Sequence, residues 1–130
     1  MILALDTREA TCRMTLISDD GKKKDSKEWF ADRQLARDLL SELEMFFSKN
    51  SNSLNDVKGL IIFKGPGSFT GLRIGITVMN TIAYSQTVPI VGETGEDWLD
   101  NGIERLLKGE NDHIVMPDYG RDPRITTPRK

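Results

Sequence analysis

The 130-residue sequence predicts an α/β domain built on a mixed sheet. Short apolar runs at residues 2–5 and 57–63 have the length and composition of buried strands, and long helical patterns follow at about 32–48 and 70–86. A turn signal, Asp19-Asp20-Gly21, lies between two further strand-like runs, so the domain opens with a β-hairpin.

The three strands of this opening differ in character. Residues 2–5 are continuously apolar, as expected of a central strand covered on both faces. Cys12, Met14 and Leu16 then alternate with polar residues, which indicates a strand with one buried face. The third strand, at about 22–30, is rich in Lys and Asp, and this composition suits a sheet edge exposed to water.

Asp32 is placed to cap the first long helix. The apolar residues of this helix fill an arc of about 140°, close to what one core contact needs: Leu35, Ala36, Leu39, Leu40, Leu43, Phe46 and Phe47. After the second helix, residues 89–92 read as a short strand and 95–108 as a third helix, which Gly109 ends. Strands that alternate with helices after an opening hairpin are typical of a ribonuclease H-like domain.

Composition and charge limit the function. A net charge of −2 argues against a dedicated nucleic-acid binder. The only cysteine, Cys12, excludes an intramolecular disulfide, and the only histidine, His113, excludes a paired-histidine metal motif. No apolar run reaches membrane-spanning length, and the first residues do not read as a signal peptide. We expect a cytoplasmic protein without a metal or cofactor.

A glycine-rich turn joins the strand at 57–63 to the helix at 70–86. The turn contains Gly65, Pro66 and Gly67, whose backbone preferences favour a change of chain direction. Either Ser68 or Thr70 can cap the helix that follows. Such a turn directs several backbone N–H groups at one spot, where a phosphate can bind; the alternative is a purely structural turn. The spacing matches neither the Walker A loop nor Gly-x-Gly-x-x-Gly.

The helix at 70–86 is apolar over an arc of about 200°, which its residues Leu72, Ile74, Gly75, Ile76, Val78, Met79, Ile82 and Ala83 form. Its polar stripe is narrow and holds Arg73, Thr77, Asn80 and Tyr84. Gly71 and Gly75 lie one turn apart and would let another backbone approach closely. The pattern favours a helix that serves its own sheet and a partner, over one buried entirely within its domain.

Asp6, at the end of the first strand, is the best candidate acid in the sequence. A strand-end Asp is more often a turn or capping residue. A two-metal nuclease would need several converging carboxylates, and Glu93 is the only nearby candidate. Ser68 has no histidine in the expected arrangement around it, so a capping role suits it better than a nucleophilic one.

The glycine-rich stretch resembles the signature of the TsaB proteins, bacterial partner subunits of the machinery that makes threonylcarbamoyladenosine in tRNA. The matching signature-loop residues include Gly65, Pro66, Gly67, Ser68, Phe69, Thr70, Gly71, Arg73 and Gly75. Ile2-Leu3-Ala4-Leu5-Asp6-Thr7 is similar to the opening strand of the family. The resemblance implies the N-terminal lobe of the actin-like ATPase (ASKHA) fold, with Asp6 and Thr7 as a vestigial phosphate site.

The same resemblance implies a non-catalytic scaffold subunit that binds a TsaD-like catalytic protein through its first two helices. The residues carried over to this interface are Leu35, Leu39, Gly71, Ile74, Gly75, Val78, Thr81 and Ile82. A TsaE-like ATPase would join the pair, tRNA would bind only within the complex, and the free chain would form a homodimer through the same surface. The competing hypotheses are a stand-alone nucleotide-binding, ATPase-like protein and a regulatory dimer.

The chain departs from the family in length. It is too short for the usual second lobe, which predicts one lobe at 1–109 and a tail at 110–130, a compact form without a cleft for ATP. Residues 33–36 lack the Arg-x-His-Ser common in the family. Pro117-Asp118-Tyr119-Gly120-Arg121 nevertheless resembles the family's C-terminal Pro-x-Tyr-x-Arg. The basic residues Arg121, Arg124, Arg129 and Lys130 either form a solvated end or touch tRNA phosphates.

Overall fold

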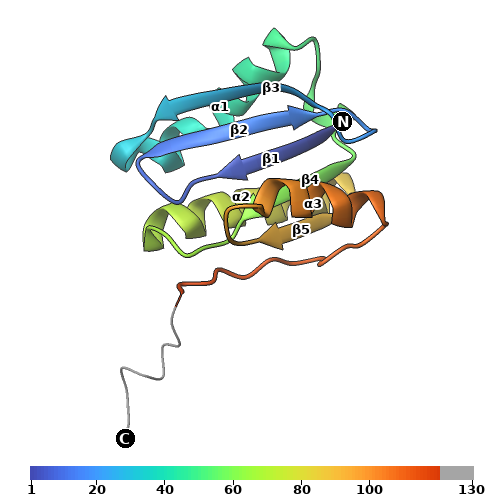
Figure 1. Cartoon of the computed structure of the whole chain (residues 1–130). Helices are drawn as coiled ribbons and strands as arrows, with labels where there is room; N and C mark the ends of the chain where they lie inside the picture. The colour runs from blue at the N-terminus through green and yellow to red at the C-terminus, as the bar shows by residue number, and fades with distance from the viewer. Residues whose placement is uncertain (121–130) are drawn as a thin grey trace, which may run out of the picture.

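The computed structural model describes residues 1–120, and its mixed sheet has five strands in the order β3-β2-β1-β4-β5 (Figure 1). β1 (Ile2–Asp6), β2 (Thr11–Ile17) and β3 (Lys23–Phe30) form the antiparallel part. β4 (Gly59–Phe63) pairs in parallel with β1, and β5 (Ile90–Glu93) pairs in parallel with β4. The predicted opening hairpin and the edge position of β3 are confirmed.

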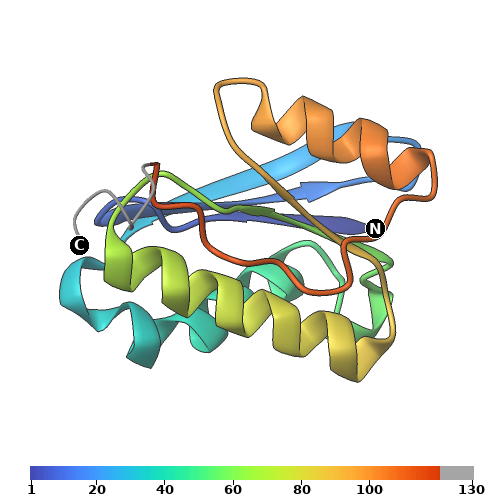
Figure 2. The ribbon, with the colours of Figure 1, turned by 90° about the horizontal axis from the view of Figure 1, so that it is seen from below.

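Helices cover both faces of the sheet (Figure 2). α1 (Leu35–Lys49) and α2 (Phe69–Gln86) lie side by side on one face, and α3 (Trp98–Leu107) lies on the other. Two short 3₁₀ turns, Asp32–Gln34 and Leu54–Asp56, come before α1 and β4. No helix within residues 1–120 is both long and apolar enough to cross a membrane. The arrangement is the predicted α/β architecture.

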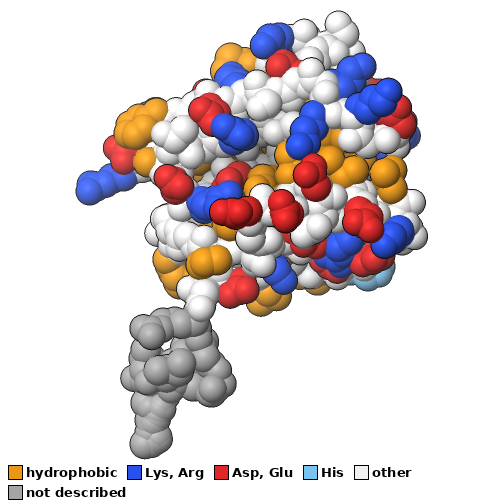
Figure 3. Space-filling model, viewed as in Figure 1, with side chains coloured by type: hydrophobic (Ala, Val, Ile, Leu, Met, Phe, Trp, Pro, Cys, Tyr) orange, Lys and Arg blue, Asp and Glu red, His pale blue; other side chains and the backbone are white. Residues whose placement is uncertain are grey.

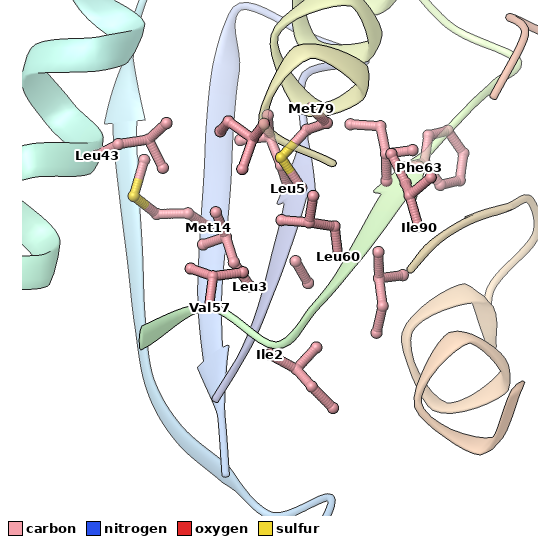
Figure 4. Packing of buried hydrophobic residues seen from close by; sticks show 14 of the residues in the cluster. Ile2, Leu3, Leu5, Met14, Leu43, Val57, Leu60, Phe63, Met79 and Ile90 are labelled. Atoms are coloured by element: carbon pink, nitrogen blue, oxygen red, sulfur yellow. The ribbon is translucent and has the colours of Figure 1, made fainter. Parts of the chain in front are cut away.

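The main core lies between the sheet and the two helices α1 and α2 (Figure 4). Leu3 of β1 is level with Leu16 of β2 and Leu60 of β4, so the three side chains share one face of the sheet. Leu43 of α1 and Met79 of α2 pack onto this face, and all five side chains are buried. This packing fixes α1 and α2 as neighbours and leaves their outer sides as one continuous surface.

The start of α1 differs from the prediction. Asp32 does not cap the helix, because it has a left-handed φ of 48° within a 3₁₀ turn and α1 begins only at Leu35. The N–H groups of Ala31 and Asp32 both donate to the carbonyl oxygen of Ala10, at 2.8 and 3.3 Å. These bonds tie the corner to the β1–β2 loop, a long-range contact that local capping rules do not capture.

The buried face of α1 is narrower than predicted. Its buried residues are Leu35, Leu39, Leu43, Phe46 and Phe47. Ala36 and Leu40, which the predicted arc included, are exposed, and Leu40 exposes 59% of its surface. The reason is that α1 contacts the sheet and α2 through one stripe, and no described part of the chain covers its outer side.

Candidate functional site

The signature loop (residues 65–75) lies against the turn that follows β1. The N–H of Ser68 donates to the carbonyl oxygen of Arg8 at 2.8 Å, and a Cβ at Gly67 would come within 2.6 Å of the Arg8 Cβ. Ser68 is the N-cap of α2, and its Oγ accepts from the N–H of Gly71 at 3.4 Å. Of the two predicted capping residues, Ser68 is the one that caps α2. The loop is fixed in place by its contacts with Arg8 of the same chain.

Thr7 explains two of the signature glycines. Its side chain is fully buried, and its hydroxyl donates to the carbonyl oxygen of Gly71 at 2.7 Å. A Cβ on Gly71 would lie 2.4 Å from the Thr7 carbonyl oxygen, and one on Gly75 would lie 2.3 Å from the Thr7 hydroxyl oxygen. Gly71 therefore lets the backbone at the end of the chain's own first strand approach closely, and Gly75 makes room for the Thr7 side chain.

The carboxylate of Asp6 is already engaged by a cation. Arg8 donates to it from Nε at 3.0 Å and from Nη2 at 2.9 Å, and its backbone N–H adds a bond at 3.1 Å. The same guanidinium lies 3.7 Å from the centre of the Phe63 ring. Arg8 thus engages both oxygens of the Asp6 carboxylate, and the phosphate site predicted at Asp6 and Thr7 stays a prediction.

No ready metal site accompanies Asp6. Within residues 1–120, no group of three or more His, Cys, Asp or Glu side chains is close enough to hold a metal ion. Glu93, the predicted second carboxylate, instead pairs with Arg105 at 2.8 Å. The described side chains therefore do not assemble the two-metal site of a nuclease.

Sequence reasoning missed the part played by residues 110–120, which we call the C-terminal strap. The strap runs beside β5 and α2 (Figures 1 and 2). The N–H of Asp112 donates to the carbonyl oxygen of Ile90 at 2.8 Å, so the strap adds to the free edge of β5. Asn80 of α2 binds both backbone groups of Val115, at 2.9 and 3.0 Å. The side chain of Asn80 thus holds the strap against α2. The predicted division into a lobe at 1–109 and a tail at 110–130 stays a prediction.

The strap ends on the signature loop. The N–H of Asp118 donates to the carbonyl oxygen of Lys64 at 2.7 Å. Gly65 has a φ of 134°, and a Cβ there would lie 1.7 Å from the carbonyl oxygen of Asp118. Only glycine fits this position, since both the backbone conformation and the contact exclude a side chain.

Aromatic rings complete the contact between strap and loop. The rings of Phe69 and Tyr119 are stacked, with centroids 4.8 Å apart and an angle of 24° between their planes. The guanidinium of Arg73 lies 5.1 Å from the centre of the Phe69 ring. A Cβ on Gly120 would come within 2.7 Å of Pro66, so the end of the strap touches the loop directly. The two stretches that resemble family motifs thus meet in space.

Arg105 of α3 holds the beginning of the strap. It forms ion pairs with Glu93, Glu110 and Asp112, and these interactions raise its pKa. Burial by itself raises the pKa of Asp112, but hydrogen bonds from Arg105 and from the N–H of Gly92 outweigh it and hold the pKa below the ordinary value. Figure 3 shows acidic and basic side chains interspersed on the face that carries α3 and β5. This network fixes the strap at the end opposite the aromatic stack.

The residues predicted for a partner interface differ in exposure. Three lie in the core, where a partner cannot reach them: Leu35, Leu39 and Gly75. Gly71, Ile74 and Val78 are half-buried on α2, and Ile82 is buried but lines a groove. Thr81 is exposed. The predicted surface is therefore reduced to the outer sides of the helices.

A groove of about 400 Å³ lies where α1 and α2 meet, and we call it the seam groove. Its apolar lining includes Leu40, Leu43, Phe47, Leu54 and Ile82. Among these, Leu40 is more than half exposed, although the sequence pattern predicts it in the core-facing arc of the first helix. Leu54 comes from the 3₁₀ turn before β4, a contact that no local pattern predicts.

Comparison with known proteins gives consistent matches. The family model described as "TsaD: tRNA N6-adenosine threonylcarbamoyltransferase" matches residues 29–94, half of the chain. The curated "tRNA threonylcarbamoyladenosine biosynthesis protein TsaB" of Escherichia coli is 30% identical, over 93% of this chain and 55% of that protein. The protein of the same name from Haemophilus influenzae is 31% identical, over 85% and 46%.

A solved structure shares the fold. "YeaZ from Pseudomonas aeruginosa" superimposes with a TM-score of 0.65 and 29% identity, covering 72% of this chain and 43% of that one. The chain spans about half the length of the curated relatives it matches.

Proposed function

Because the chain belongs to the TsaB family, we propose that it serves the synthesis of threonylcarbamoyladenosine in tRNA as a non-catalytic subunit. In this proposal it binds a TsaD-like catalytic protein, a TsaE-like ATPase joins the pair, and tRNA binds only to the assembly. When the partner is absent, two copies of the chain associate through the same surface. The names of the relatives support a role in threonylcarbamoyladenosine synthesis. The apolar surface of α1 and α2 supports binding to a protein partner.

The seam groove is the observation that carries the proposal. Leu40 lines the groove and is 59% exposed, and Ile82 is the residue of α2 that lines it. Outside the groove, the half-buried Ile74 and Val78 lie two turns and one turn before Ile82 on the same side of α2. Contiguous exposed apolar surface of this kind marks interaction sites in soluble proteins. Two neighbouring helices with an open apolar seam can accept two helices of a partner as a bundle.

The strand-end chemistry supports an accessory role. Arg8 engages the carboxylate of Asp6, and Thr7 donates its hydroxyl to Gly71, so both groups of the predicted phosphate site are used within the chain. The signature loop holds the C-terminal strap through Gly65 and Phe69. The sequence signature therefore has a structural use that requires no nucleotide.

Two matched leucines test the proposal. Leu40→Asp places a charge beside the seam groove, and Leu107→Asp places one at a leucine of similar exposure, 54%, on the opposite face of the sheet. We expect Leu40→Asp to weaken binding to the TsaD-like protein at least about tenfold, because a desolvated, unpaired charge is costly at an interface. Leu107→Asp should bind like the unmodified chain.

The measurement is titration of the TsaD-like protein with each variant, after thermal melts confirm that both are folded. Unchanged affinity of the Leu40→Asp chain would contradict the proposed interface. Equal losses in both variants would indicate a general effect of charge and would also count against it.

A further inference from the structure

The strap fills a site on the rest of the chain, and the outer edge of β5 forms one side of that site. The backbone groups that β5 directs away from β4 belong to Ile90 and Gly92, and each has a partner. The N–H of Ile90 donates to Oδ1 of Asn111 at 3.1 Å, and the N–H of Gly92 donates to Oδ2 of Asp112 at 2.9 Å. The carbonyl oxygen of Ile90 accepts from the N–H of Asp112 at 2.8 Å, and that of Gly92 accepts from Arg105 at 3.3 Å. The strap therefore takes the place of a further strand at this edge.

The other side of the site is α2, and it also recognises an extended segment. Asn80 binds both the N–H and the carbonyl oxygen of Val115, as a neighbouring strand would. The Val115 side chain is 3% exposed and lies against Gly92, where a Cβ would come within 2.5 Å of it. The strap meets these requirements with the segment Asn-Asp-x-x-Val at residues 111–115.

The strap has few buried contacts. Within residues 110–120 only Val115 is buried and only Pro117 is half-buried. The neighbours of Val115, Ile114 and Met116, expose 67% and 69% of their surface. Segments with so little buried apolar surface open at a lower free-energy cost than the fold as a whole. The strap can therefore leave its site before the rest of the chain unfolds.

The connection between α3 and the strap can act as a hinge. Lys108, Gly109 and Glu110 are all exposed. Gly109 has a φ of 86°, and no described atom beyond its chain neighbours lies within 4 Å of the position that a Cβ would take. The chain can change direction there without displacing a packed side chain. A segment on such a hinge can exchange between identical chains, because every contact made within one copy can also be made between two.

We propose that the site between β5 and α2 binds the strap of a second copy, so that two chains are joined by exchange of residues 110–120. The occupant follows from the site, because a second strap offers the same Asn-Asp-x-x-Val segment that fills it within one chain. An apolar face beside the strap supports the same occupant. Tyr84, which is 89% exposed, and Ile114 line one hollow of about 750 Å³. Joining two copies at the strap brings a second surface next to this face.

The inference goes beyond the proposed function and does not depend on it. Ile82 lines the seam groove, whereas Asn80, two positions earlier, holds the strap. Two positions correspond to about 200° around a helix, so the groove and the strap lie on opposite flanks of α2. A pair of chains joined by their straps therefore leaves both seam grooves free for a protein partner.

A complementation experiment with two full-length variants tests the inference. Val115→Asp damages the strap and leaves the site intact, whereas Gly92→Val fills the space of the Val115 side chain and leaves the strap intact. Both chains also carry Leu40→Asp, which disfavours association through the seam groove. We expect each variant alone to have the mass of one 14.7 kDa chain in light scattering coupled to size exclusion. An equimolar mixture at high micromolar concentration should contain a species of twice that mass, because one chain supplies the strap and the other the site.

A matched control replaces the Gly92→Val chain with the double variant Gly92→Val and Val115→Asp, which has no intact strap. Mixed with the Val115→Asp chain, it should leave both proteins as single copies. NMR of the labelled Val115→Asp chain locates the contact, and we expect shifts at Asn80 and Ile90 only when the Gly92→Val chain is added. Thermal melts show whether the variants fold, and Asn80→Ala replaces Gly92→Val if that chain does not.

The inference is overturned if every mixture contains only single copies. It is also overturned if either variant alone, or the control mixture, forms the species of double mass, because another surface would then join the copies. Since both chains carry Leu40→Asp, the outcome does not depend on the seam groove. The proposed function can therefore fail without this inference, and this inference without the proposed function.

Discussion

The hydroxyl of Thr7 donates a 2.7 Å hydrogen bond to the carbonyl oxygen of Gly71, which joins the end of β1 to the first turn of α2. One turn further along, Gly75 lies so close that a Cβ would fall 2.3 Å from the same hydroxyl oxygen. The signature glycines therefore set the distance between α2 and the sheet. That distance also determines how the outer side of α2 is presented beside α1.

Gly75→Ala should destabilise the fold by about 1–3 kcal/mol, because the added methyl overlaps the Thr7 side chain in a closely packed place. Thr77→Ala, at an exposed position of the same helix, should change stability by less than about 0.5 kcal/mol. Urea unfolding measures both. In the double variant Thr7→Ala and Gly75→Ala, part of the loss should be recovered. A Gly75→Ala chain as stable as the original would contradict the close contact.

Acid should weaken the anchoring of the strap. The pKa of Asp112 lies below its ordinary value of 3.8 in the folded chain, so its carboxylate contributes stability above that pH. This contribution is lost as the pH falls through the lowered pKa. Asp112→Asn should therefore cost roughly 1 kcal/mol at pH 7, and the difference from the original chain should shrink in acid. Urea unfolding from pH 7 to strongly acidic pH provides the measurement, and a difference that stays constant would refute the prediction.

The thiol of Cys12 should be unreactive in the folded chain. Burial and the nearby Asp6 carboxylate raise its pKa from 9.0 to about 11, so little thiolate is present at pH 8. We expect a thiol reagent to label Cys12 slowly in buffer and rapidly in denaturing urea. Because the folded pKa is the higher one, the associated stability is present below pH 9 and declines as the pH rises toward 11. Rapid labelling of the folded chain would show that the site is more open than the structure indicates.

The chain alone should not bind ATP measurably. Arg8 neutralises Asp6 at the strand end, and the hydroxyl of Thr7 is committed to Gly71. Calorimetric titration of the isolated chain with ATP and magnesium should give no binding heat, for the original chain and for Asp6→Ala alike. Saturable binding that disappears in Asp6→Ala would favour the competing hypothesis of a stand-alone nucleotide-binding protein.

The sequence predicted the order of strands and helices because each element carries its own local pattern. The apolar run before Asp6, the alternation around Met14 and the glycine turn at Gly65 each identify an element without knowledge of the others. The ends of helices were less predictable. The sequence pattern predicts Asp32 as a helix cap, but the N–H of Asp32 donates to the carbonyl oxygen of Ala10. This bond is a tertiary contact, and local capping preferences cannot predict it.

The contacts of the strap could not be read from the sequence. Asn80 and Val115 are thirty-five positions apart, and spacing does not say which distant segments meet. The strand-end position identifies Asp6 as a candidate acid, but it does not identify Arg8, two residues further on, as the partner of Asp6. That Asp-x-Arg spacing is the signal that could have revealed the ion pair. The basic residues from Arg121 onward lie outside the described residues, and their role stays a prediction.

The most direct test of the account is light scattering coupled to size exclusion, on the chain alone and mixed with the TsaD-like protein of the same organism. The account predicts a stable complex that contains at least one copy of each protein, with the mass of the 14.7 kDa chain added to that of its partner. Separate elution of the two proteins at micromolar concentration, each at its own mass, would contradict the proposed scaffold function.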